Sequence, residues 1–203
     1  MYLGRIISIG SNEEGSYASY RVSSRSFPNR QSVVNGKKVA IVPTEGSEDD
    51  IYKNPYISYN CMDIIDDICV ITNGSHTDII AGKIREGMNM RDAIALSLLA
   101  MDYEKDDYNT PRIAGAINYA GEGFIGIVRD DGIEVIKVNP GEAYYVSTYE
   151  HNSPRKVEYD AHSSEEATKF IYGKGIFADF THPVTACAAF GKKKWRISYK
   201  NPQ

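Results

Sequence analysis

Short hydrophobic runs separated by tight turns dominate the first third of the chain. The pattern predicts strands over residues 2–9, 16–25, 38–44, 57–65 and 68–72. The polar segment 11–15, the dipeptide Asn35-Gly36 and the pair Asp66-Asp67 have the composition of turns between them. Strands joined by such short turns pair antiparallel, because a parallel pair needs a long crossover.

Helical patterns follow, mixed with further strands. Helices are expected over 79–86 with Asp78 as cap, over 90–101 with Asn89 and Asp92 as capping box, from Thr110-Pro111 onward, from Ser163 and Glu166 to Gly173, and over the alanine-rich segment 183–190. Strands are expected over 123–129, 133–138, 143–149 and 156–159. Residues 68–71 and 124–128 are apolar almost throughout, which indicates strands buried on both faces. The expected fold class is α+β in layers, with one domain over 1–190 and a frayed basic tail over 191–203.

Composition and charge narrow the possible functions. The 203 residues include 23 basic and 27 acidic side chains, and the net charge of −4 disfavours binding to nucleic acid or an anionic membrane. The three cysteines (Cys61, Cys69 and Cys187) have no metal-site spacing, and with no signal peptide at the start they indicate a reducing cytoplasm. The four histidines show no i,i+4 pairing, so no metal site is expected.

An acidic segment follows the predicted helix 90–101, although the C-terminal end of a helix favours basic side chains. Asp102, Glu104, Asp106 and Asp107 surround Lys105 where the predicted helix 90–101 ends, although the end of a helix carries partial negative charge. Repulsion and burial would raise the pKa of one carboxyl group, as a general base or acid requires. A solvated acidic loop explains the composition equally well.

A basic cluster comes earlier in the chain. Arg21, Ser23 and Arg25 share one face of a predicted strand, and Asn29 and Arg30 follow a turn at Phe27-Pro28. Guanidinium groups bind oxyanions with two hydrogen bonds, so this cluster suits a phosphate, although an exposed polar strand face is the simpler alternative. The segment 72–78 and the start at Thr110-Pro111-Arg112 offer further weak anion sites.

Several long strings of residues resemble one known family. They are Tyr2-Leu3-Gly4-Arg5, residues 20–30 (YRVSSRSFPNR), 54–61 (NPYISYNC), 73–78 (NGSHTD), 96–106 (LSLLAMDYEKD), 109–114 (NTPRIA) and 180–185 (FTHPVT). In this order they are similar to the archaeal IMP cyclohydrolase family, and the resemblance covers essentially residues 1–190. Residues beyond Phe190 look longer than the family requires.

The resemblance implies a reaction and a fold. The reaction is the dehydrating ring closure of 5-formamido-1-(5-phosphoribosyl)imidazole-4-carboxamide to inosine monophosphate, the last step of de novo purine biosynthesis. Such enzymes are classed as hydrolases acting on a cyclic amidine C–N bond. The implied fold is a four-layer αββα sandwich of two stacked, mainly antiparallel sheets, like the N-terminal-nucleophile hydrolases. Because this chain begins Met1-Tyr2-Leu3, no N-terminal nucleophile is expected.

The chemistry of ring closure assigns expected roles. Proton transfer is expected from Glu104 or Asp102, and stabilisation of the oxyanion from Lys105 and Tyr59. Arg21, Arg25 and Arg30 are expected around the phosphate or ribose. The other expected substrate-binding residues are Asn29, Asn60, Asn73, Ser75, His76, Thr110, Arg112 and His182. The expected partner is a small nucleotide substrate with no metal or other cofactor, and a homo-oligomer is left open.

Two other functions fit parts of this pattern. The arginines and helix-start anion sites alone would serve a nucleotide-binding module without catalysis. The implied fold alone would suit an amidohydrolase, which would use a processed N-terminal residue.

Overall fold

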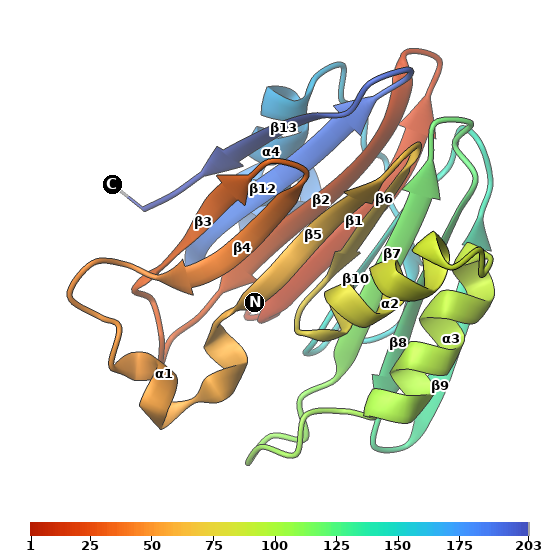
Figure 1. Cartoon of the computed structure of the whole chain (residues 1–203). Helices are drawn as coiled ribbons and strands as arrows, with labels where there is room; N and C mark the ends of the chain where they lie inside the picture. The colour runs from red at the N-terminus through yellow and green to blue at the C-terminus, as the bar shows by residue number, and fades with distance from the viewer. Residues whose placement is uncertain (203) are drawn as a thin grey trace.

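The computed structural model describes residues 1–202 and arranges thirteen strands in two sheets (Figure 1). The six-stranded sheet runs in the order β11 (Arg155–Lys156), β10 (Ala143–Ser147), β1 (Arg5–Asn12), β2 (Gly15–Ser23), β12 (Pro183–Gly191) and β13 (Arg196–Lys200). The seven-stranded sheet runs in the order β3 (Arg30–Asn35), β4 (Lys38–Pro43), β5 (Tyr59–Ile65), β6 (Ile68–Thr72), β7 (Arg112–Asn118), β8 (Gly123–Arg129) and β9 (Gly132–Val138). All paired strands are antiparallel, as the short turns predict.

Helices cover the outer faces of both sheets. Helix α4 (Ser164–Gly173) and the 3-10 helix η2 (Gly175–Asp179) pack on the six-stranded sheet, whereas α2 (His76–Arg85) and α3 (Met90–Met101) pack on the seven-stranded sheet. Two short elements, α1 (Asp50–Lys53) and η1 (Pro55–Ile57), lie in the connection between β4 and β5. The predicted α+β fold with layers is therefore confirmed (Figure 1).

The central core lies between the two sheets. Alternation along β1 shows how it forms: Ile7 and Ile9 point to the other sheet, whereas Ile6 points outward to the core under α4. On β2, Tyr20 and Val22 take the inward face beside them. A side chain on this inward face near a strand end therefore lies at the end of the gap between the sheets.

The capping predictions are confirmed at two helices. The Asn89 side chain accepts a hydrogen bond from the backbone N–H of Asp92, and α3 occupies the predicted residues. The Ser163 side chain likewise accepts a bond from the backbone N–H of Glu166. The prediction for Asp78 is wrong, because α2 begins at His76 and Ser75 takes the capping position.

The alanine-rich segment is a strand, not the predicted helix. In β12, Cys187 and Ala189 face the other sheet while Ala186 and Ala188 face the core under α4. Small side chains fit a strand that is buried on both faces, and this tertiary constraint outweighs the intrinsic helix preference of alanine.

The frayed tail predicted at the C-terminus is wrong as well. Residues 196–200 form β13, which pairs with β12 at the edge of the sheet. The Asn201 side chain then accepts a bond from the N–H of Ser32 and donates one to its carbonyl oxygen, which links this end to β3 of the other sheet.

Other predicted boundaries also change. Thr110-Pro111 opens no helix and precedes β7 directly, because the Thr110 hydroxyl bonds to Asp106 and Tyr149 instead of capping a turn. Strand β3 and helix α1 were not predicted, and the predicted strand over 156–159 is reduced to the two residues of β11. No helix in residues 1–202 has the length and apolar character needed to cross a membrane.

Candidate active site

A pocket of about 390 Å³ lies at the end of the sandwich where β1 begins. Both sheets contribute to this end, which is the lower one in Figure 1. The lining comes from the start of the chain at β1, from the loop after β2 and from three other connecting segments. It consists of Tyr2, Arg5, Ser24, Arg25, Ser26, Phe27, Asn54, Asp106, Tyr108, Tyr149 and Glu150.

A buried ion-pair cluster adjoins this pocket. Arg5 Nη2 donates to Glu104 Oε2 at 2.9 Å, and Arg112 Nη1 lies 3.6 Å from Glu104 Oε1. The side chain of Glu104 is 1% exposed, and those of Arg5 and Arg112 are 13% and 7% exposed. Glu104 is held there by its backbone N–H, which bonds to the carbonyl oxygen of Thr110 and closes the loop after α3.

Burial and charge act in opposite directions on Glu104. Burial raises the pKa of this carboxyl group and outweighs the charges of Arg5 and Arg112, which lower it. For Arg5, burial is the largest single influence and lowers the pKa, but Glu104 and the neighbouring tyrosines together outweigh it, so the pKa of the guanidinium is raised and it stays charged. A carboxyl group with a raised pKa beside fixed cations can take up and release a proton, as a general base and acid must.

Arg30 and two tyrosines extend the cluster between the sheets. Arg30, at the start of β3, is 2% exposed, and its Nε donates to the carbonyl oxygen of Phe27 at 3.0 Å. The hydroxyl groups of Tyr20 and Tyr59 lie 2.5 Å apart. Burial raises the pKa of Tyr59, while the nearby charges of Arg30 and Arg5 lower it. The tyrosine hydroxyl is thus a neutral donor beside two cations.

His76 and Asn73 border the cluster on the side of the seven-stranded sheet. His76 Nε2 lies 2.9 Å from the carbonyl oxygen of Ile113, which can only accept, so Nε2 carries the proton and Nδ1 presents a lone pair. Burial lowers the pKa of His76 to about 3, which keeps the ring neutral. The Asn73 amide bonds to the backbone of Pro111 and Ile113, and so fixes the start of β7 that carries Arg112.

Polar atoms without a partner concentrate at this cluster. Among residues 1–202, eight buried side-chain nitrogen or oxygen atoms have no hydrogen-bond partner. Five of them belong to the cluster: Arg5 Nε, Arg30 Nη1, His76 Nδ1, Glu104 Oε1 and Arg112 Nε. Since buried polar groups are normally satisfied, such a concentration indicates a place where a polar ligand or ordered water completes the hydrogen bonds.

Other predicted residues lie at the rim. The Thr110 hydroxyl bonds to Asp106 and to Tyr149, which lines the pocket. Arg25 is exposed, and its guanidinium lies 4.1 Å from the centre of the Tyr2 ring. Tyr2 also contacts the exposed His182 edge to face, with ring centres 6.0 Å apart.

The structure places Arg21 away from this site. Arg21 faces outward under α4, where its guanidinium donates to carbonyl oxygens of Ile171, Tyr172, Phe177, Phe180 and Thr181 and to the hydroxyl of Ser23. The alternation that groups Arg21 with Ser23 is correct, but α4 and η2 cover this face, and their carbonyl oxygens bind the guanidinium in place of a phosphate.

Asp102 and Lys105 pair with each other and not with Glu104. They form an exposed ion pair of 2.6 Å, and Lys105 Nζ lies over the ring of Tyr103. The hydrogen bond with Lys105 lowers the pKa of Asp102. The other predicted residues outside the cluster are Asn29, which is exposed, Asn60, which donates to Asp78, and Ser75, which is exposed at the start of α2.

Two central residues, Arg5 and Tyr20, are absent from the predicted set. Arg5 alternates with Ile7 and Ile9 on the inward face of β1, so a charged residue occupies a core-facing position. That alternation was a usable signal in the sequence. Tyr20 gave no comparable signal, because tyrosine is common in strands.

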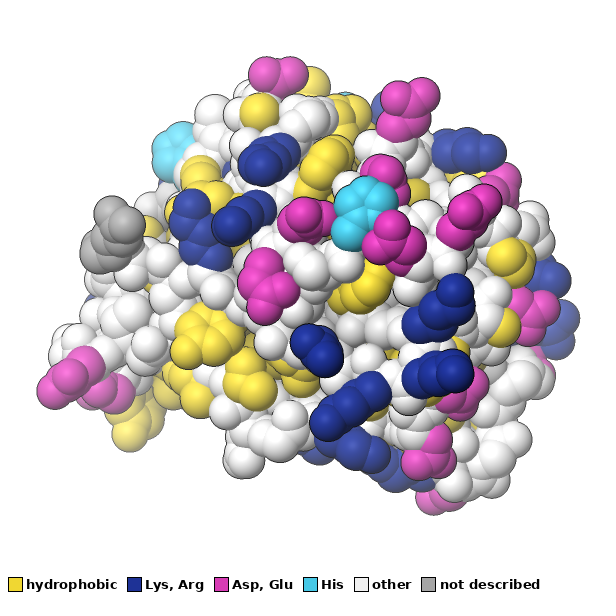
Figure 2. All heavy atoms as spheres, turned by 90° about the horizontal axis from the view of Figure 1, so that it is seen from above, with side chains coloured by type: hydrophobic (Ala, Val, Ile, Leu, Met, Phe, Trp, Pro, Cys, Tyr) yellow, Lys and Arg dark blue, Asp and Glu magenta, His cyan; other side chains and the backbone are white. Residues whose placement is uncertain are grey.

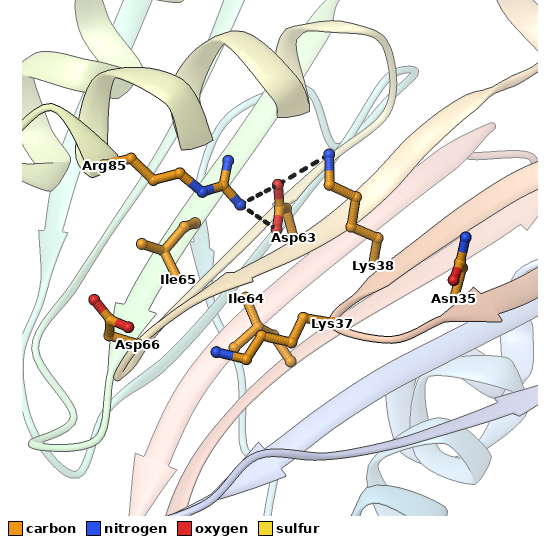
Figure 3. A pocket seen from close by; sticks show the side chains of 8 residues that line it. All are labelled: Asn35, Lys37, Lys38, Asp63, Ile64, Ile65, Asp66 and Arg85. Carbon is orange, nitrogen blue, oxygen red and sulfur yellow. Dashed lines mark hydrogen bonds and ion pairs between the residues drawn. The ribbon is translucent and has the colours of Figure 1, made fainter.

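A second pocket, of about 560 Å³, lies at the opposite end of the seven-stranded sheet (Figure 3). There the buried carboxylate of Asp63 accepts two bonds of 2.7 Å from Arg85 Nη2 and lies 3.3 Å from Lys38 Nζ. None of the buried atoms without a partner in residues 1–202 belongs to its lining. Asp63, Arg85 and Lys38 therefore bind one another, and no ligand is needed to account for them.

The surface and the side-chain groupings bear on the expected partners. Figure 2 shows the end of the molecule opposite the candidate site, where several Lys and Arg side chains gather on one part of the surface and acidic side chains lie around them. Within residues 1–202, no group of three or more His, Cys, Asp or Glu side chains is arranged to hold a metal ion.

Comparison with known proteins identifies the class of protein that this fold and site define. The family described as IMP cyclohydrolase-like protein matches residues 2–195, and the chain belongs to this family. A relative from Methanosphaera stadtmanae, named IMP cyclohydrolase, is 78% identical over 202 residues, and the match covers 100% of both chains. Relatives of the same name from Methanococcus maripaludis strain S2 (45% identical, 98% of this chain, 99% of the relative) and Methanocella arvoryzae (46%, 94% and 92%) are also similar. The match to the first of these relatives extends over the whole chain, whereas the match to the family ends at residue 195.

Proposed function

We propose that this chain catalyses the ring closure of 5-formamido-1-(5-phosphoribosyl)imidazole-4-carboxamide to inosine monophosphate, with release of water. The family and the names of its relatives support this reaction. The observation that carries the mechanism is the buried Glu104 between Arg5 and Arg112, beside a pocket and surrounded by donors without a partner.

The reaction needs two proton transfers and a site for negative charge. The carboxamide nitrogen attacks the formyl carbon and forms the new C–N bond, while the formyl oxygen gains negative charge. One proton leaves the carboxamide nitrogen and a second leaves the nitrogen that carried the formyl group. Both end on the formyl oxygen, which departs as water as the C=N bond of the ring forms. Because the reacting groups belong to one molecule, the enzyme mainly holds their geometry and moves these protons.

Glu104 is the proposed proton carrier. As a carboxylate it accepts the proton from the attacking nitrogen, and as a neutral acid it returns a proton to the departing oxygen. Arg30 and Tyr59 are the proposed donors to the oxygen that becomes negative, because a guanidinium with an unpaired Nη1 and a neutral hydroxyl lie on the same inward face. Fixed donors of this kind stabilise developing charge without reorganisation.

The phosphate is proposed to lie at the mouth of the pocket. Arg25 is exposed there, between Ser24 and Ser26 on the loop after β2, and it rests on Tyr2. An arginine on a polar loop suits a phosphate that stays partly hydrated. The imidazole end of the substrate would then reach inward to Glu104, with Thr110, Tyr149 and His182 at the sides.

Three finer assignments belong to this proposal. The layers of helix, sheet, sheet and helix support kinship with the N-terminal-nucleophile hydrolases, although the proposed chemistry uses the interior of the sandwich and not the chain terminus. Residues 1–190 are the proposed catalytic domain, which β13 completes. Cys61 and Cys187 lie with their sulfur atoms 3.7 Å apart and unbridged, which supports the cytoplasm as the location.

The test is conversion of the formylated precursor by the purified chain, followed by the ultraviolet change on ring closure, with EDTA present. We expect turnover to inosine monophosphate, and Glu104→Gln prepared in parallel excludes a contaminating enzyme. Tight binding of product without turnover would favour a nucleotide-binding module. Release of ammonia from amide substrates without ring closure would favour an amidohydrolase.

A further inference from the structure

We propose that Arg5 is a positioning residue that holds Glu104 as a carboxylate and thereby sets the pH above which ring closure proceeds. This inference rests on the proposed role of Glu104 as the proton carrier. It assigns to Arg5 an effect through Glu104 that is separate from binding the substrate.

The geometry makes Arg5 the direct partner of the carboxylate. Arg5 Nη2 donates to Glu104 Oε2 at 2.9 Å, and within residues 1–202 this is the one hydrogen bond that the Glu104 side chain makes. Arg112 Nη1 lies farther away, at 3.6 Å from the other oxygen. Arg5 is fixed by its strand, because its backbone N–H bonds to Thr148 Oγ1 and β1 is paired on both sides.

The charged and titratable groups around the pair come from every neighbouring element. Arg112 of β7 faces Glu104 together with Arg5, and Asp106 of the same loop opposes them. Four groups face Arg5: Tyr20 of β2, Tyr59 of β5, Arg30 of β3 and Tyr149 after β10. His76 of α2 faces both Arg5 and Arg112. Burial raises the pKa of Glu104, and Arg5 is the largest influence that lowers it. Without Arg5, the more distant Arg112 alone would oppose burial and Asp106.

The experiment compares the pH dependence of kcat in the whole chain and in Arg5→Gln, Arg5→Lys and Arg85→Gln. The Arg85 variant is the matched control, because it also removes an arginine from a buried carboxylate, that of Asp63. We expect the acidic limb of the Arg5→Gln profile to move to higher pH by about one to three units, with activity regained at alkaline pH. The acidic limb of Arg5→Lys should lie between those of the unsubstituted chain and Arg5→Gln. The acidic limb of Arg85→Gln should coincide with that of the unsubstituted chain. A lower rate with an unmoved limb in both Arg5 variants would overturn the proposal.

A second measurement does not depend on catalysis. The carboxyl carbon of Glu104, assigned by its loss in Glu104→Gln, is titrated by ¹³C NMR in the folded chain and in the two Arg5 variants. The midpoint should rise in Arg5→Gln, and in Arg5→Lys if the glutamine variant does not fold. An unchanged midpoint would overturn the role of Arg5. Full turnover by Glu104→Gln would instead refute the proposed role of Glu104, whatever the NMR midpoint shows.

Discussion

Arg21, which is buried, and Arg5, which is 13% exposed, lie on neighbouring strands in opposite settings. Arg21 points outward, where carbonyl oxygens at the ends of α4 and η2 and in the segment after them accept its hydrogen bonds. Arg5 points inward to the gap between the sheets, where it pairs with Glu104 and leaves Nε without a partner. The first arginine completes a local structure, whereas the second belongs to a set of polar atoms that no protein group completes.

The difference shows that a buried arginine can have a structural or a functional role in this fold, depending on whether the protein binds all of its donors. Neutral carbonyl groups hold Arg21, and burial lowers its pKa to about 10 without a compensating acid. A fully satisfied polar group stabilises one conformation, while a partly satisfied cluster costs stability unless a ligand completes it. By this criterion Arg21 differs from the other three arginines. A buried nitrogen atom has no hydrogen-bond partner in Arg5, Arg30 and Arg112.

The largest expected effect is loss of activity in Glu104→Gln. The amide cannot accept and return the proton, so kcat should fall by about 10² to 10⁴-fold, measured by the ultraviolet change on ring closure. The control is Glu142→Gln, which removes a carboxylate from the exposed ion pair with Lys156 and should keep normal turnover. If the folded Glu104→Gln chain turned over substrate within threefold of normal, the cluster around Glu104 would not be the functional site.

Arg21→Met should affect stability instead of chemistry. The change leaves several buried carbonyl oxygens without a donor, so the free energy of unfolding should fall by about 3 to 5 kcal/mol, measured by urea denaturation. The turnover of the folded fraction should stay within about threefold of normal, and Arg196→Met on exposed β13 is the control. Unchanged stability with a tenfold higher KM would return Arg21 to the phosphate site predicted from the sequence.

These expectations show what alternation along a strand can and cannot predict. It placed Arg21 and Ser23 on one face, but it could not tell whether a helix or the second sheet covers that face. The same rule applied to Arg5, Ile7 and Ile9 marks a charge on a core-facing position. Alanine-rich β12 was mistaken for a helix because burial on both faces selects small residues, and a single segment does not reveal its neighbours. The sequence predicted that the acidic loop supplies a general base or acid. Which of its side chains turns inward depends on the backbone conformation after α3, which the sequence pattern does not reveal.

An intermediate effect concerns His76 and the pH dependence of stability. Its pKa is about 3 in the folded chain and near 6.5 when unfolded, so below pH 6.5 the unfolded chain binds a proton that the folded chain does not. Its contribution to stability is present above pH 6.5 and is lost as the pH falls toward 3. By pH 5.5 the loss should be about 1 kcal/mol.

The measurement is urea unfolding between pH 7.5 and 5, compared between the original chain and His76→Gln. The glutamine variant should lose less stability over this range, because glutamine does not titrate. His162→Gln removes a half-exposed histidine and serves as the control. Equal losses in the original chain and in His76→Gln would show that His76 is not the titrating group.

The smallest expected effect is that of Lys105→Gln and Asp102→Asn. The two side chains form an exposed pair, which solvent screens, and within residues 1–202 neither makes a hydrogen bond or ion pair with Arg5, Glu104 or Arg112. Asp102 ends α3 with φ of 55° and ψ of −174°, a conformation that is strained for any residue with a side chain. Asparagine has the same size and shape as aspartate and keeps the side-chain oxygen that accepts from the N–H of Tyr103, so the backbone that turns Glu104 inward should persist. Both variants should keep kcat and KM within about twofold of normal in the ring-closure assay. A hundredfold loss of kcat in Lys105→Gln would mean that the lysine swings inward when substrate binds, and catalysis would then draw on the loop surface as well as on the interior of the sandwich.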